Sequence, residues 1–186
     1  RNSRLFLFCQ GVKTVSILKV DTINEKTTGN GVAIPGHVIQ TVSTKFTTVT
    51  STTSTSYIDI NSGTLAITPK FSNSKISVHF NFSLGYSASG SYMYGGFQLL
   101  RGSTVLTTPP HDGTGAFEFG TSIGSSTTIE RYERYSHHLI DSPSTTSAVT
   151  YKAQFKAYGA GGGTVTINPG SVSVGNSYII LQEIAQ

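Results

Sequence analysis

The residues with the most obvious catalytic potential are His111 and Asp112, an imidazole next to a carboxylate in a stretch rich in Pro and Gly. Adjacent side chains of an extended chain point apart, and no nucleophile motif of the form GxSxG accompanies the pair. A general base also needs a third group that orients it. We therefore interpret His111 and Asp112 as part of a solvated surface turn, with no catalytic residues, and expect that the chain is not an enzyme.

A second set with chemical potential is His137, His138 and Asp141, which are residue types that bind metals. Neighbouring histidines on a strand face opposite sides of the sheet, so only one of them could join a given site. Such a site would take the same histidine from several copies of the chain around a symmetry axis. Because imidazoles at strand ends usually serve as hydrogen-bonding groups, we predict no metal and no cofactor and leave a metal on such an axis as the alternative.

Tyr86, Tyr92 and Tyr94 stand among Gly and Ser in the stretch 86–96, which we interpret as a loop. Tyrosine offers a flat apolar ring and a hydroxyl at a low entropic cost, and this combination suits sugar binding. The irregular stretch 107–126, which contains His111 and Asp112, is predicted as a second surface loop. Together these five residues are the candidate recognition surface. The alternative for the tyrosines is that they only pack their loop.

Composition limits the other classes of function. The chain has 186 residues, of which 37% are hydrophobic and only 12% are charged, and Ser, Thr and Gly are abundant. The net charge of +4 is spread thinly, so we predict no nucleic-acid binding. The single cysteine, Cys9, excludes an intrachain disulfide framework. No apolar run approaches membrane-spanning length, so we predict no membrane insertion.

Two-residue alternation predicts the fold. Apolar side chains recur at every second position of Ile76 to Tyr86 and of Val149 to Ala157, which is typical of half-buried antiparallel strands. Shorter strands are predicted at 57–60 and 65–67, separated by a turn at 61–63. Many short strands spaced by turns, with no helices, indicate an antiparallel β-sandwich, and a jelly roll fits best.

The two ends of the chain differ from its middle. Residues 1–36 are rich in turn residues and too short to build a core, so we predict an extended N-terminal arm followed by a sandwich domain at 37–186. The alternative is a first strand of the sheet and a long loop. The last strand is apolar on both faces, with Tyr178, Ile180 and Ile184 on one side and Ile179 and Leu181 on the other. Such a strand is central in its sheet or covered by a neighbouring subunit.

Several short motifs resemble small virion proteins of tailed bacteriophages, especially marine ones. Residues 16–23 (SILKVDTI) resemble the N-terminal signature of this group, and the later motifs occur in the same order: 67–69 (ITP), 74–76 (SKI), 100–103 (LRGS), 139–143 (LIDSP), 149–152 (VTYK) and 177–184 (SYIILQEI). Each piece is short, and the set is distinctive. Residues 1–13 depart from the pattern, since the signature normally stands at the very start.

The resemblance implies a location and partners. Proteins of this group are fibre, spike or head-decoration components, and their C-terminal domains resemble the trimeric jelly rolls of the C1q and tumour-necrosis-factor type. It implies a homotrimer on the virion surface, with an arm that docks on other virion proteins of the tail or capsid and a domain that contacts host glycan. The docking residues would be Ile17, Leu18, Val20 and Ile23, and the trimer or core residues Tyr178, Ile179, Ile180, Leu181 and Ile184. A head-decoration protein and a secreted lectin-like module are the alternatives.

Overall fold

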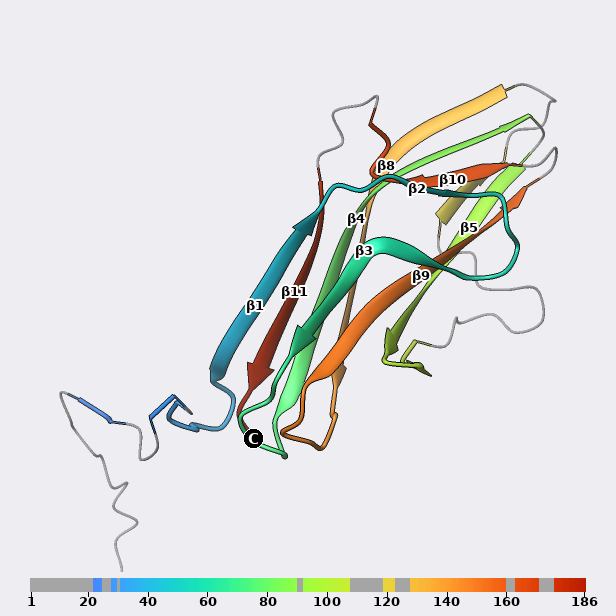
Figure 1. Ribbon diagram of the computed structural model, residues 1–186. Coiled ribbons are helices and arrows are strands. Elements are labelled where there is room, and N and C mark those ends of the chain that lie inside the picture. Colours follow the sequence, from blue (N-terminus) through green and yellow to red (C-terminus); the bar gives the residue numbers. More distant parts are fainter. Residues whose placement is uncertain are drawn as a thin grey trace, which may run out of the picture. The chain divides into compact units, whose positions relative to one another are not determined.

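The computed structural model describes residues 22–24, 28–29, 31–89, 92–107, 119–122, 128–159, 163–170 and 176–186 (Figure 1). The chain divides into two compact units, Arg1–Val32 and Ala33–Gln186, and every strand of the described residues belongs to the second unit. These residues contain no helix, and thus no helical segment that could cross a membrane.

The strands form two antiparallel sheets, which confirms the predicted β-sandwich. Sheet A contains β1 (Val38–Phe46), β2 (Thr50–Thr52), β4 (Lys75–Ser89), β8 (Thr128–Asp141), β10 (Thr164–Ile167) and β11 (Ser177–Ile184). Sheet B contains β3 (Ile58–Ile67), β5 (Tyr92–Arg101), β6 (Thr104–Val105), β7 (Phe119–Ser122) and β9 (Val149–Gly159). Every pairing between strands is antiparallel.

The long strand β4 organises sheet A. One of its edges pairs with β8 from Ile76 to Ser89. Its other edge is shared: β11 pairs with residues 75–81 and β10 with residues 84–87. Sheet A therefore has two halves, with β1 and β11 on one and β10 and β2 on the other, and β8 borders both (Figure 1).

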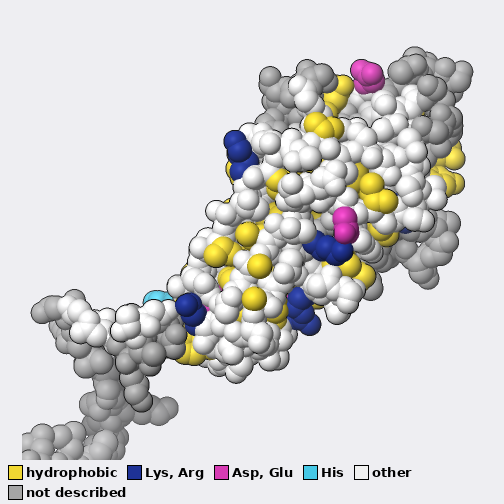
Figure 2. Space-filling model, viewed as in Figure 1, with side chains coloured by type: hydrophobic (Ala, Val, Ile, Leu, Met, Phe, Trp, Pro, Cys, Tyr) yellow, Lys and Arg dark blue, Asp and Glu magenta, His cyan; other side chains and the backbone are white. Residues whose placement is uncertain are grey.

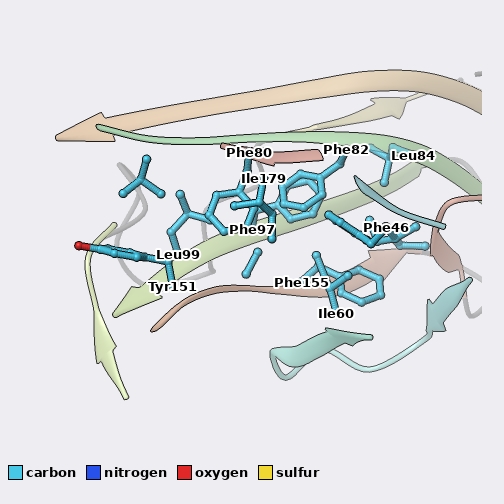
Figure 3. Packing of buried hydrophobic residues seen from close by; sticks show 14 of the residues in the cluster. Phe46, Ile60, Phe80, Phe82, Leu84, Phe97, Leu99, Tyr151, Phe155 and Ile179 are labelled. Carbon is cyan, nitrogen blue, oxygen red and sulfur yellow. The ribbon is translucent and has the colours of Figure 1, made fainter. Parts of the chain in front are cut away.

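The core lies between the sheets and is built from the alternating faces that the sequence predicts. Phe80 and Phe82 of β4 and Phe155 of β9 are all fully buried. The rings of Phe82 and Phe97 stack across the sandwich with centroids 4.5 Å apart (Figure 3). Because burying each such side chain contributes about 1.5–3 kcal/mol relative to exposure, this aromatic layer is the main stabilising element of the fold.

Two local predictions were wrong. The stretch 58–67 is one strand, β3, and residues 61–63 form a bulge inside it, where the pairing with β9 shifts between Asp59 and Thr64. Ser62 has a positive φ of 61° there, and a Cβ on Gly63 would lie 2.8 Å from the Cβ of Ile60. The stretch 86–96 is not a loop, since β4 continues to Ser89 and β5 begins at Tyr92.

The last strand is central in its sheet, which is one of the two predicted arrangements for it. β11 lies between β1 and β4 (Figure 1). Ile179 and Leu181 are fully buried in the core. On the outer face of sheet A, Tyr178 is 40% exposed, and Ile180 and Ile184 are half-buried.

The surface of the sandwich carries few charges, as the composition predicts. In Figure 2 most of the visible surface is uncharged, with few basic or acidic side chains and small hydrophobic areas between them.

Candidate functional site

Two of the three tyrosines predicted for recognition lie together on the outer face of sheet B. Tyr92 and Tyr94 are on the same side of β5, because the buried Met93 between them points into the core. Tyr158 of β9 is the cross-strand neighbour of Tyr94. The ring centroid of Tyr92 lies 5.4 Å from that of Tyr94 and 5.9 Å from that of Tyr158. We call Tyr92, Tyr94 and Tyr158 the tyrosine cluster.

The tyrosine cluster presents both ring area and hydroxyl groups. Tyr158 is 44% exposed, and Tyr92 and Tyr94 are half-buried. A hydrogen bond with Tyr158 raises the pKa of Tyr92. Sequence reasoning missed Tyr158, although it continues the outward-facing positions 150, 152, 154 and 156 of β9.

Tyr86, the third predicted tyrosine, does not join this surface. It lies on β4, is only 4% exposed and belongs to the buried core cluster. Burial raises the pKa of its hydroxyl. Tyr86 is therefore no part of the surface that Tyr92 and Tyr94 form. The reason is that the alternation of β4 extends past Tyr86 into the segment that was interpreted as a loop.

A hollow of about 220 Å³ opens on the outer face of sheet A, and we call it the Gly85 pocket. Gly85 of β4 has Tyr132 of β8 and Thr166 of β10 as its cross-strand neighbours. A Cβ on Gly85 would lie 3.1 Å from the ring of Tyr132 and 3.1 Å from Cγ of Pro169. Because Gly85 has no side chain, the floor of the pocket stays open. The pocket is lined by Val49, Gly85, Tyr86, Ser87, Glu130, Tyr132, Thr166, Pro169 and Gly170.

The lining of the Gly85 pocket suits a small ligand that carries hydroxyl groups. The ring of Tyr132 is 40% exposed, and the carboxylate of Glu130 is an acceptor. Ser87 and Thr166 add hydroxyls, and Thr166 is held by a 2.9 Å hydrogen bond to Ser51. A ring beside hydroxyl and carboxylate acceptors is a combination that binds sugars. The sequence signal that could have revealed this pocket is a glycine inside a regular strand.

The structure does not bring the candidate metal ligands His137, His138 and Asp141 together. His138 points to the outer face of sheet A, where its Nε2 lies 2.9 Å from the hydroxyl of Ser77. His137 stacks on Tyr135 with centroids 6.3 Å apart, so the two histidines face opposite sides, as alternation requires. Among the described residues, no group of three His, Cys, Asp or Glu side chains is arranged to hold a metal.

Asp141 has a different role, because it ties the two sheets together. Its carboxylate accepts hydrogen bonds from Nη1 of Arg101 at 2.7 and 2.8 Å and from the hydroxyl of Tyr151 at 2.7 Å. Arg101 and Tyr151 come from sheet B, whereas Asp141 ends β8 of sheet A. Burial and the carboxylate raise the pKa of Tyr151. This arrangement is structural, since its donors and acceptors satisfy one another.

The other predicted site residues give less information. His111 and Asp112 lie outside the described residues, as do Ile17, Leu18 and Val20. Ile23 is described, and its side chain is 57% exposed.

Comparison with known proteins adds little to this geometry. No protein-family model and no curated protein matches the chain. Among solved structures, a chain in the structure of infectious bursal disease virus, Gx strain, is similar at 10% sequence identity with a TM-score of 0.29. The match covers 90% of this chain and 42% of that one, so this chain spans less than half the length of the solved chain. A likeness at this level identifies no family.

Proposed function

We propose that this chain is a structural protein of a bacteriophage virion, a trimeric fibre or spike component whose β-sandwich contacts sugars on the host surface. The observation that carries the host contact is the tyrosine cluster, three tyrosines gathered from β5 and β9 on the outer face of sheet B. The ordered set of sequence motifs supports the virion location. The proposed partners are further copies of this chain, other virion proteins and host glycan.

The chain acts in this proposal by binding and assembly and not by catalysis. Three carboxylates of the described residues support this view, because they are bonded to other parts of the fold. Asp141 joins the sheets, and Asp59 forms an ion pair with Lys152 at 2.9 Å. Glu183 is buried and accepts backbone N–H groups. These groups are occupied by the fold and are not poised beside a nucleophile.

The proposed trimer contact is the outer face of sheet A around β11. Tyr178 is 40% exposed there, and Val38 of β1 is 50% exposed. Ile180 and Ile184 add half-buried apolar surface on the same strand. A neighbouring copy that covered this stripe would remove apolar area from water, which is favourable by about 25 cal/mol per Å² before the costs of association are subtracted.

Glycan binding is tested with the full chain on an array of bacterial surface saccharides. Tyr92→Ala and Tyr158→Ala should each weaken binding about fivefold or more, because the loss of an aromatic contact lowers affinity by about 1 kcal/mol or more. Tyr132→Ala is the matched variant, since it removes a tyrosine of similar exposure from the Gly85 pocket. Unchanged binding in both cluster variants, with loss in Tyr132→Ala, would move the sugar site to that pocket.

The virion location is tested by labelling phage particles, from a culture that produces this chain, with an antibody against it. Label on projecting fibres or spikes supports the proposal. Label spread regularly over the head would instead support a decoration protein that coats the capsid. Particles without label, together with secreted chain in the culture fluid, would refute the virion location and favour the lectin-like module.

A further inference from the structure

Strand β8 has an open edge of unusual length. It pairs with β4 from Thr128 to Asp141, and within the part of the chain that the structure describes no strand pairs with its other side. An open edge presents a row of backbone donors and acceptors to any second strand. Natural proteins protect such an edge with charged side chains, and β8 carries four charges in a row of five residues.

The order of these charges is specific. Residues 130–134 read Glu-Arg-Tyr-Glu-Arg. When two copies of β8 run antiparallel with Tyr132 opposite Tyr132, Glu130 lies opposite Arg134 and Arg131 lies opposite Glu133. Two-fold symmetry repeats both pairs, so four cross-strand pairs of opposite charge form in this register. Opposite charges across an antiparallel pair are stabilising, and like charges are destabilising.

The neighbouring antiparallel registers are unfavourable. The competing registers differ by two residues, because a one-residue slip would set side chains from opposite faces of the sheet against each other. A slip of two residues in one direction places Arg131 opposite Arg131, and a slip of two in the other places Glu133 opposite Glu133. Charges that only protected an edge would need no such order. The pattern therefore favours one register with a second copy of the same strand and disfavours the registers beside it.

We propose that β8 is a two-fold contact, in which the β8 strands of two copies pair antiparallel about Tyr132 and join their six-stranded sheets A into one continuous sheet. Glu130, Arg131 and Arg134 are exposed and can reach a partner. Arg134 already donates one hydrogen bond to Oδ1 of Asn81 and another, of 3.1 Å, to the carbonyl of Asn176. Its guanidinium carries five donors, so it has further N–H groups for the partner's carboxylate.

The first test exchanges the charges and reads the mass of the full chain by light scattering. In a dimer of Glu130→Arg, the new Arg lies opposite Arg134 of the other copy, and the two-fold axis repeats this pair. In a dimer of Arg134→Glu, the new Glu likewise lies opposite Glu130 in both symmetry-related pairs. Each variant alone should dissociate at this contact with an affinity lowered about tenfold or more. An equimolar mixture of the two restores both pairs and should associate as the native chain does. Ser103→Arg, which adds a charge at the exposed turn between β5 and β6, is the control.

The second test is a cross-link on the symmetry axis. In a Cys9→Ser background, Tyr132→Cys places two thiols opposite each other, about 4.5–5.5 Å apart between Cα atoms, which is within disulfide range. Mild oxidation should give a covalent dimer. Ser136→Cys is the control, because its two thiols would lie eight residues apart along the strands, or about 27 Å.

The results distinguish the proposal from simple edge protection. Weakened single variants, a restored mixture and a dimer specific to Tyr132→Cys support the two-fold contact. A mixture that associates no better than the single variants would overturn it. Equal cross-linking of the two cysteine variants, or no cross-linking of Tyr132→Cys, would also overturn it. So would a native chain whose mass in solution is the same as that of the two charge variants.

Discussion

Replacing Glu183 with Gln tests how the segment between β3 and β4 is held against β11. The Glu183 side chain is fully buried, an unusual position for a carboxylate. Its Oε1 accepts the backbone N–H groups of Lys70 at 2.8 Å and Phe71 at 3.1 Å. Its Oε2 accepts a hydrogen bond from Nε2 of Gln40 at 2.6 Å. One ionised side chain therefore satisfies donors from two other segments of the chain.

The magnitude follows from these contacts. A glutamine at 183 can keep the two backbone bonds through its carbonyl oxygen, but its amide NH₂ then faces the NH₂ of Gln40. Rotation of the Gln40 amide would break the 2.7 Å bond that it donates to the carbonyl of Thr68. The variant thus loses at least one hydrogen bond to a charged group, which is a loss of about 1.5–3 kcal/mol and lowers the melting temperature by about 3–12 °C.

The same variant has a pH signature. Burial by itself raises the pKa of Glu183, but the hydrogen bonds from Lys70, Gln40 and Phe71 outweigh it and lower the pKa below the ordinary 4.5. A carboxyl whose pKa is lower in the folded state stabilises the fold at pH values above its unfolded pKa. That stabilisation is lost as pH falls through the folded pKa. The stability difference between native chain and variant should be full at pH 7 and should shrink below about pH 4.5.

The assay is urea unfolding of both proteins at pH 7 and pH 3, at low protein concentration. Glu130→Gln is the matched control, because it removes an equal charge from an exposed position of β8 and should change stability by less than about 0.5 kcal/mol. A Glu183→Gln variant as stable as this control, or a difference from the native chain that is the same at both pH values, would refute the argument.

Three further predictions concern other parts of the sandwich. Asp141→Ala leaves Arg101 and the hydroxyl of Tyr151 without their acceptor and should lower the unfolding free energy by about 1–3 kcal/mol in urea titrations. Gly85→Ala puts a methyl group 3.1 Å from the ring of Tyr132; it should cost about 1–3 kcal/mol in thermal unfolding and remove any sugar binding in the Gly85 pocket. Tyr178→Arg should leave thermal stability within about 0.5 kcal/mol but dissociate a β11-mediated trimer in light scattering.

The architecture could be predicted from sequence wherever one face of a strand is fully buried. In β4 and β9 the apolar positions alternate without a break, and the structure buries these positions. The predictions failed where turn residues occur inside strands. Asn61 to Gly63 reads as a turn, yet the chain only bulges there, because β9 continues to pair on both sides of it. Pairing with a distant strand overrides a local turn preference.

The candidate sites show a different limit. Tyr92 and Tyr94 could be selected from their composition, but Tyr158 joins them only through the register of β5 with β9. The Gly85 pocket likewise depends on the register of three strands, which places Tyr132 and Thr166 on either side of a glycine. Residue types predict the chemistry that is available, whereas cross-strand register decides which side chains meet.

The two proposed contacts between copies differ in place, symmetry and chemistry, so the mass of the full chain can separate them. The trimer contact uses the half of sheet A where β11 pairs with residues 75–81 of β4, and the two-fold contact centres on Tyr132, opposite Gly85 on the other half. A closed assembly that held both contacts would be a pair of trimers. Salt screens the exposed charge pairs of β8 but not the apolar stripe of β11. Raising the salt concentration should therefore split a hexamer into trimers, whereas a split into dimers would show that the trimer contact is the electrostatic one and refute this assignment.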